Sequence, residues 1–320
     1  MTPPLGDSPR RPSPRQFALR RVLGLIIILL VLGGLGWLAV AAIGGGGKQA
    51  QQLSTVASTL FLRTVTKSTP TGPVETVIAM VKPLHIVFPE GFTRRQMAAR
   101  AEAVNRIAEQ KRHVRPNLSR AGYLAATRVP RVPVCFKGKV KTLEGFLFPA
   151  TYEFFPGTSS AQLVRDQLGA FCDNWNQVDL RYARRKNLTP YDVLIIASMV
   201  EKEAVVPKER PLVSAVIYNR LHAGMPLGID ATLRYGLDIP PTRSILQSQL
   251  SSDSPYNTRK HKGLPPTPIA NPGLPSMEAA ARPAKVNYLY FVRKPDKKHH
   301  FFTASYQAFQ SYANAHGYGP

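Results

Sequence analysis

The feature that most constrains this chain is an unbroken run of uncharged residues at positions 22–43. A run of this length is sufficient to span the roughly 30 Å hydrocarbon core of a bilayer, so it predicts a transmembrane helix. Residues 1–21 form a basic, Pro-rich tail, and only Lys48 follows the run closely. The positive-inside rule therefore predicts a cytoplasmic N-terminus, with the chain beyond about residue 48 outside the cytoplasm. A cleaved signal peptide ending near residues 39–41 is the alternative.

The charge balance points to an anionic partner. There are 42 Lys and Arg residues against 19 Asp and Glu, a net charge of +23. Such a balance is typical of proteins that bind nucleic acid, anionic lipid or an acidic polymer. Because an exported domain does not meet nucleic acid, we expect no nucleic-acid partner and favour the carboxylates and phosphates of a cell envelope. A nucleic-acid-binding protein is the alternative if the domain stays in the cytoplasm.

The two cysteines, Cys135 and Cys172, have no metal-type spacing and imply no disulfide framework. They form either one bridge outside the cytoplasm or two buried thiols. The adjacent His299 and His300 lack a third ligand at metal spacing, so His300 is expected to be a hydrogen-bonding residue at a strand end. We therefore expect no metal and no cofactor.

Turn and cap signals divide the exported part. Residues 44–73 are expected to be a linker and lead-in with a strand at 61–65. Strands are expected at 74–80 and 84–88, and Thr93 with Gln96 predicts a capping box for a helix that runs to about residue 110. The interpretation is a small βα module at 74–135 and a main domain at 136–320.

The main domain is expected to be mainly helical with a small antiparallel sheet, so the predicted fold class is α+β. The pattern predicts an amphipathic helix at 161–174, a second helix from Pro211 to a stop at Gly224, and long ordered loops at 238–283. Strands at 286–292 and 301–302 and a short C-terminal helix complete it.

One helix carries an acid on an apolar face. Thr189 is a good N-cap and begins a helix that runs to about residue 204. Helical spacing places Ile196, Met199 and Glu203 on one side. A carboxyl group there loses hydration, which raises its pKa and keeps it protonated, as a general acid requires. Glu201 lies roughly 160° away. The alternative is that the helix ends there and both acids are solvated.

A series of short motifs then follows in order along the chain: LEGFLFP (143–149), ASMVEKE (197–203), YNRL (218–221), MPLGIDAT (225–232), SPYNT (254–258), GLPP (263–266), PIANPG (268–273), AAARP (279–283) and YLYFV (288–292). This series resembles the endolytic murein transglycosylases, the MltG or YceG-like family. Residues 84–105 more loosely resemble the LysM-like module of that family.

The resemblance implies a single-pass enzyme of the plasma membrane that cuts nascent peptidoglycan inside its glycan strands. The bond is the β-1,4 link between N-acetylmuramic acid and N-acetylglucosamine, and the product carries a 1,6-anhydro end. The catalytic position of the family falls on Glu203, acting as general acid and then base, with Glu201 as the fallback. The expected partners are glycan strands, the membrane, and peptidoglycan synthases or division proteins.

Further site residues are expected around Glu203. Glu144 and Glu201 are expected to support the site, with Glu144 capping or bracing the helix of Glu203. Asp230 is either a second carboxylate or an acid that braces a loop. Contacts with substrate are expected from Tyr218, Asn219, Asp230, Thr232, Tyr256, Asn257 and Thr258. Core packing explains Tyr218 equally well. For Asn257 and Thr258 the alternative is that they form the turn.

The chain departs from the family pattern at Ala150, Ala204, Arg259 and Phe309, where the family usually has an acid, Thr or Ser, Tyr, and His. These changes bear on substrate preference more than on the reaction class. Two functional alternatives remain: a muramidase that uses water with Asp230 as partner, and an anchored scaffold that binds glycan without cutting it. The former predicts reducing ends, and the latter predicts that Glu203→Gln has no effect.

Overall fold

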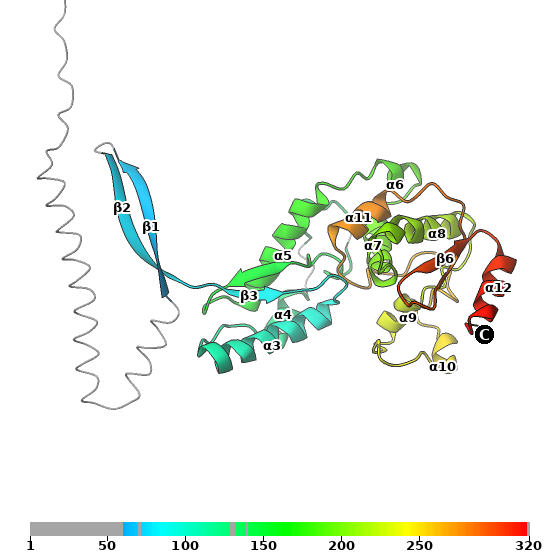
Figure 1. Ribbon diagram of the computed structural model, residues 1–320, viewed down its shortest axis with the longest axis horizontal. Coiled ribbons are helices and arrows are strands. Elements are labelled where there is room, and N and C mark those ends of the chain that lie inside the picture. Colours follow the sequence, from blue (N-terminus) through cyan, green and yellow to red (C-terminus); the bar gives the residue numbers. More distant parts are fainter. Residues whose placement is uncertain (1–59, 70–71, 129–131, 139, 319–320) are drawn as a thin grey trace, which may run out of the picture. The chain divides into compact units, whose positions relative to one another are not determined.

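The computed structural model of the chain describes residues 60–69, 72–128, 132–138 and 140–318 (Figure 1). These residues divide into two units, one ending at Lys82 and the other beginning at Pro83. The expected tail (1–21), transmembrane helix (22–43) and first part of the linker lie outside the described residues. Among the helices that are described, none is both long and apolar enough to cross a membrane.

The first unit contains one antiparallel hairpin, β1 (Leu60–Thr69) and β2 (Gly72–Val81). Leu60 pairs with Val81 at one end, and Thr69 pairs with Gly72 at the other. Both expected strands, at 61–65 and 74–80, are confirmed. They extend further than expected because each provides the backbone hydrogen-bond partners of the other.

The second unit begins with β3 (Leu84–Val87), α3 (Arg94–Arg112), α4 (Arg120–Ala126) and β4 (Thr151–Phe154). The capping box at the start of α3 is confirmed, with Thr93 and Gln96 exchanging hydrogen bonds. β3 pairs antiparallel with β4, so this β–α–α–β unit closes at Phe154. The strand at 84–87 thus finds its backbone partner at 151–154, beyond the span of 74–135 that the sequence predicts for the βα module.

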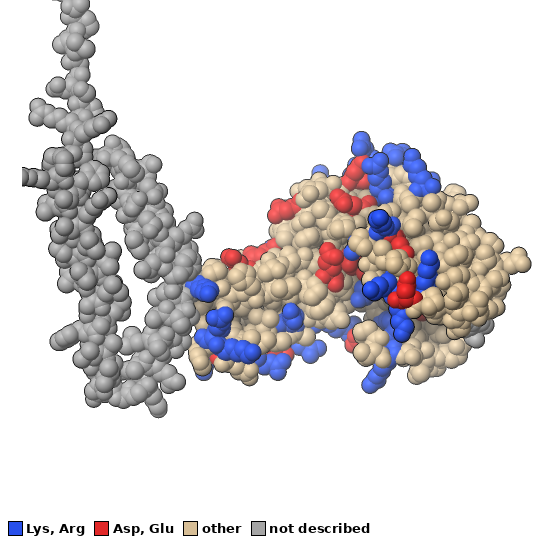
Figure 2. All heavy atoms as spheres, in the orientation of Figure 1, with Lys and Arg blue, Asp and Glu red and all other residues tan. Residues whose placement is uncertain are grey.

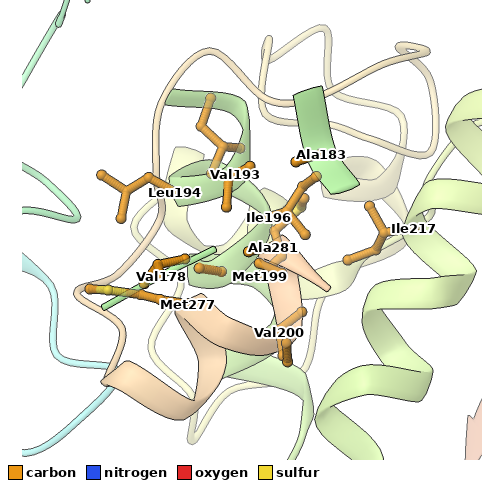
Figure 3. Packing of buried hydrophobic residues seen from close by; sticks show 14 of the residues in the cluster. Val178, Ala183, Val193, Leu194, Ile196, Met199, Val200, Ile217, Met277 and Ala281 are labelled. Atoms are coloured by element: carbon orange, nitrogen blue, oxygen red, sulfur yellow. The ribbon is translucent and has the colours of Figure 1, made fainter. Parts of the chain in front are cut away.

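Helix α7 (Pro190–Glu203) lies at the centre of the remaining helices and packs against α8, α9 and α11 (Figure 1). Every residue from Val193 to Val200 is buried. Figure 3 shows five of them (Val193, Leu194, Ile196, Met199 and Val200) in one hydrophobic cluster with Ile217, Met277 and Ala281. The surrounding elements are α5 (Ser160–Trp175), α6 (Arg181–Arg185), the 3-10 helix η1 (Pro207–Glu209), α8 (Arg210–His222), α9 (Asp230–Gly236), α10 (Gln247–Leu250) and α11 (Leu274–Ala281).

A second hairpin, β5 (Tyr290–Arg293) and β6 (His300–Thr303), is covered by α12 (Tyr306–Ala315). The strand expected at 286–292 is shorter and begins at Tyr290. The second unit is therefore a mainly helical α+β domain with two small antiparallel sheets where the sequence predicted one. The additional sheet is β3–β4, whose strands are separated by more than 60 residues in the sequence.

The two cysteines form a disulfide, with Cα atoms 5.5 Å apart. The bond joins Cys135, in the segment between α4 and β4, to Cys172 of α5. Of the two alternatives that the sequence left open, the structure has the bridge.

Candidate active site

Glu203 is the last residue of α7, and the preceding helix explains its position. Thr189 caps the helix with a hydrogen bond from the backbone of Asp192, whose side chain accepts from Thr189 in return. Ile196 and Met199 are fully buried on the same side, whereas Glu203 is half-buried. The helical face predicted from the sequence is therefore confirmed. The helix ends at Ala204, which adopts an extended conformation.

Glu203 lies in a cleft of about 1370 Å³. α7 contributes Lys202 and Glu203, and α9 contributes Asp230, Ala231, Arg234 and Tyr235. The side of β5 and α12 adds Tyr290, Arg293, Tyr306 and Phe309, and the side of α3 and α4 adds Arg95, Gln96 and Arg120. Seven Lys and Arg side chains line the cleft against three acids. The walls around Glu203 therefore carry more positive than negative side chains.

The electrostatic setting keeps Glu203 available as an acid. Burial and, after it, the negative charge of Asp230 raise the pKa of Glu203 from 4.5 to about 7. The positive charge of Arg293 and a hydrogen bond from the Ala231 backbone oppose this rise without cancelling it. At neutral pH Glu203 is therefore present both protonated and ionised, which suits a group that first donates and then accepts a proton.

Asp230 is the nearest candidate for a second carboxylate. It is the first residue of α9, lines the cleft, and leaves 48% of its side chain exposed. Its Oδ1 accepts hydrogen bonds from Nε and Nη2 of Arg259 at 2.9 and 2.6 Å. Arg259, one of the departures from the family pattern, therefore forms an ion pair with Asp230.

Glu144 is the most deeply buried acid of the site region, with 2% of its surface exposed. Oε1 accepts from the backbone of Arg94 and from the amide of Asn271, both at 2.8 Å, and Oε2 accepts from the hydroxyl of Tyr235 at 3.1 Å. Burial outweighs these hydrogen bonds and raises the pKa of Glu144 to about 7. Glu144 thus caps α3, and the expectation that it braces the helix of Glu203 is wrong, because Arg94 begins the helix that it meets.

Gly145 makes the turn after Glu144 possible. Its φ is +91°, in the left-handed region that favours glycine, and a Cβ there would stand 2.8 Å from the side chain of Pro268. Its amide donates to Oδ1 of Asn271 at 2.8 Å. The motifs at 143–149 and 268–273 are therefore two halves of one buried contact.

Glu201 points away from the cleft, as its helical position predicted. Its Oε2 accepts from the backbone of Gly273 at 3.0 Å, at the residue that precedes α11. It therefore supports the site by holding the start of α11 against α7, and it is not among the residues that line the cleft.

Three of the expected contact residues are closed off from solvent. Thr232 and Asn257 have no exposed surface, and Thr258 has 2%. The hydroxyls of Thr232 and Thr258 are 2.9 Å apart, and Asn257 donates to the carbonyls of Leu250 and Ser252. Because a buried side chain does not reach a sugar, these residues shape the loops that carry Asp230 and Arg259.

The remaining expected contacts also serve the fold. Tyr256 bonds to the hydroxyl of Thr267 at 2.7 Å and packs edge-on against Tyr235. Tyr218 donates to the carbonyl of Ala280, and the amide of Asn219 donates to two carbonyls just before β5. Tyr218 and Asn219 line a separate hollow of about 590 Å³, outside the cleft of Glu203. Of the seven expected contacts, the structure places only Asp230 on the cleft.

The structure adds residues that the motifs did not single out. Arg293 is exposed at the end of β5, and its charge acts on Glu203. Arg220 lies 5.2 Å from the centre of the Tyr290 ring and donates to carbonyls on both sides of the cleft wall. Arg220 lies within the motif 218–221, whereas Arg293 directly follows the motif 288–292. Neither motif by itself shows that these side chains line the same cleft.

The structure confirms that His300 is a hydrogen-bonding residue at a strand end. Its Nδ1 lies 2.7 Å from Oε2 of the buried Glu209, and its backbone donates to the other oxygen. Within the part of the chain that the structure describes, no group of His, Cys, Asp and Glu side chains has an arrangement that would hold a metal ion.

Comparison with known proteins confirms the resemblance seen in the motifs. A sequence model of the YceG-like family matches residues 63–315. The chain is similar to proteins named endolytic murein transglycosylase from Bacillus subtilis (strain 168), at 39% identity over 156 residues, and from Streptococcus pneumoniae (strain ATCC BAA-255 / R6), at 31% over 254 residues. These matches cover 48% and 72% of this chain but 42% and 43% of the relatives, so the chain spans less than half of their length.

The fold is also similar to that of a solved protein. The crystal structure of a yceG-like protein from Listeria monocytogenes superimposes with a TM-score of 0.58 at 32% sequence identity. The superposition covers 72% of this chain and 76% of that one.

Proposed function

The chain belongs to the YceG-like family, and on that premise we propose that it is an endolytic lytic transglycosylase of peptidoglycan with Glu203 as its catalytic acid and base. The observation that carries the proposal is the setting of Glu203. It is a recessed acid with a pKa of about 7, it lies in a long cleft, and it stands at the position that matches the catalytic glutamate of the family.

The reaction needs one carboxyl group. In the first step protonated Glu203 gives its proton to the oxygen of the β-1,4 bond as the C1–O bond of N-acetylmuramic acid breaks. In the second step the Glu203 carboxylate takes the proton of the C6 hydroxyl of the same sugar, and that oxygen bonds to C1. The products are a 1,6-anhydro end and a free hydroxyl on the leaving sugar, and Glu203 is again protonated.

The ion pair between Asp230 and Arg259 supports this single-acid scheme. An inverting hydrolase needs a second carboxylate that activates water, and a retaining one needs a second carboxylate as nucleophile. The two other acids that line the described cleft are Asp230 and Asp238, and each is paired with an arginine. Both hydrogen bonds from Arg259 engage Oδ1 of Asp230. A water-using muramidase is the second candidate, favoured only by the presence of Asp230 on the cleft.

We propose further that the enzyme is anchored in the plasma membrane by residues 22–43, with the second unit outside the cytoplasm. The disulfide between Cys135 and Cys172 supports this placement, because such bonds persist in oxidising compartments and are rare in the cytoplasm. An anchored enzyme acts on strands close to the membrane, where nascent glycan is made, so peptidoglycan synthases and division proteins are the partners that we propose.

The test is mass spectrometry of the fragments that the full chain, purified in detergent, releases from uncrosslinked peptidoglycan strands. Wild type is compared with Glu203→Gln and with Glu278→Gln, a matched change of an exposed acid on α11 that does not line the cleft. We expect anhydro-ended fragments from wild type and the Glu278 variant and none from the Glu203 variant. Reducing ends would identify a muramidase, and equal binding without cleavage by all three would identify a scaffold.

A further inference from the structure

The two ends of the cleft differ in chemistry, and this difference bears on which strands the proposed enzyme would cut. Figure 1 shows α3 with α4 and, on the other side, α12 at opposite ends of the second unit, with α7 and α9 between them. All of these elements contribute to the same cleft. The cleft therefore extends from Glu203 in two directions, one arm toward α12 and the other toward α3 and α4.

The arm toward α12 is aromatic. Tyr290 of β5 lies 5.4 Å from the ring centres of both Tyr306 and Phe309 of α12. Tyr306 leaves 55% of its surface exposed. Since the core of the protein does not need an exposed ring, this aromatic arm (Tyr290, Tyr306 and Phe309) offers flat, uncharged surface for the apolar faces of sugar rings.

The arm toward α3 and α4 is basic. It presents Arg95, Arg120 and Lys202, and all three are exposed. Arg95 pairs with Asp238 at 3.1 Å, whereas Lys202 reaches only the carbonyl of Gly91 at 3.3 Å. Among the described residues, Arg120 has neither a hydrogen-bond acceptor nor an acidic partner for its side chain. Figure 2 shows Lys and Arg side chains gathered over this end of the second unit.

We propose that this basic arm (Arg95, Arg120 and Lys202) binds free carboxylates on the peptide stems of the glycan strand, while the aromatic arm binds sugar rings. The inference rests on the proposed function. The sugar backbone itself is uncharged, so the anions that a bound strand brings into the cleft are the carboxylates of its substituents. An anionic lipid surface is a poorer occupant, because these cations line a concave cleft that is continuous with Glu203 and a flat bilayer does not enter it.

The size of the effect follows from the exposure of these cations. An exposed ion pair contributes up to about 1 kcal/mol, a factor of about five in affinity, and salt weakens it. Two contacts of about 0.7 kcal/mol each, from Arg95 and Arg120, therefore favour a strand with free carboxylates over an uncharged one by roughly tenfold at low salt. The preference should fall toward unity at about 1 M salt, where the Debye length is about 3 Å.

The experiment compares two substrates of equal size. Uncrosslinked strands whose stems carry free carboxylates are set against the same strands with those carboxylates amidated. For wild type we expect kcat/KM to be roughly tenfold higher with the free carboxylates. Arg95→Gln with Arg120→Gln should bring this ratio close to one. Arg184→Gln, an exposed arginine of α6 outside the cleft, is the matched control and should keep the wild-type ratio.

Two further measurements separate this inference from the proposed function. Tyr306→Leu should lower kcat/KM for both substrates by about the same factor and leave the ratio unchanged. Binding of the Glu203→Gln protein to both strands tests the preference without turnover. If the protein binds strands with free carboxylates more tightly but wild type cleaves neither substrate, the proposed reaction is refuted and the inference about the basic arm stands. Equal rates and equal binding for the two strands, or an unchanged ratio in the double Arg variant, would overturn the inference.

Discussion

Replacing Glu203 with Gln should make the protein more stable at alkaline pH while it removes the proposed activity. The structure raises the pKa of Glu203 from 4.5 to about 7 because the ionised form is poorly hydrated at the floor of the cleft. When a carboxyl group has a higher pKa in the folded state than in the unfolded state, its contribution to stability is smallest at pH values where it is ionised in both states. The native state therefore loses stability as the pH rises from about 4.5 through 7, and glutamine does not carry this cost.

The expected size follows from the shift. One pKa unit corresponds to about 1.4 kcal/mol, so a rise from 4.5 to about 7 costs about 3 kcal/mol once the pH is well above 7. At pH 5 only about 1 kcal/mol of this cost is present. Because Glu203 is half-buried and water screens its open side, we expect the difference between the two pH values to be roughly 2 kcal/mol.

The assay is urea unfolding of wild type and Glu203→Gln at pH 5 and pH 8.5, with the midpoint and slope measured for each. The variant should gain roughly 2 kcal/mol more over wild type at pH 8.5 than at pH 5. Subtracting wild type at each pH removes the parallel contribution of Glu144. Glu278→Gln, on the exposed surface of α11, should show no such difference. An equal change at both pH values, or a less stable variant at pH 8.5, would refute the idea that burial perturbs Glu203.

Three other outcomes are expected. Cleavage by wild type should fall about tenfold per pH unit above 7, as the acid form of Glu203 is lost. Asp230→Asn should move this alkaline limb of the pH–rate profile to lower pH, because the charge of Asp230 raises the pKa of Glu203. If the alkaline limb does not move, the titrating group is not Glu203. Asn271→Leu should destabilise the protein by more than about 2 kcal/mol in urea unfolding, since it leaves the amides of Gly145 and Leu147 without a partner and removes one hydrogen bond from Glu144. Exposed Asn287→Leu should change stability by less than about 0.5 kcal/mol. Cys135→Ser with Cys172→Ser should cost about 4 kcal/mol for a closed loop of this length, and a reductant should lower the stability of wild type but not of the double variant.

The Glu144 network explains how the two sides of the cleft are held together. Glu144 and Asn271 join the start of α3, which carries Arg95 of the basic arm, to α9, which carries Asp230 and Tyr235. These contacts are buried or partly buried, and each links segments more than 40 residues apart in the sequence. The separation of α3 from α9 across the cleft therefore depends on Glu144 and Asn271, neither of which lines the cleft.

The sequence alone was sufficient to predict α7, its N-cap and the side on which Glu203 lies. These are local properties, because helical periodicity and capping depend on residues within a few positions of one another. The ordered motifs were also sufficient to identify the family, since each motif needs only its own residues and its place in the series. The strands of both hairpins and the helix α3 follow from the same short-range signals.

Only the tertiary structure decided what the polar residues of those motifs do. Asn257, Thr232 and Thr258 have side chains that suit either a sugar or a turn, and burial assigns them to turns. Glu144 was placed on the wrong helix because its partner, Arg94, lies 50 residues away and no local pattern reports such a contact. The same holds for the pairing of β3 with β4 and for the gathering of Arg95, Arg120 and Arg293 on one cleft. Periodicity shows which way a side chain points along its own element, but long-range packing determines what it meets.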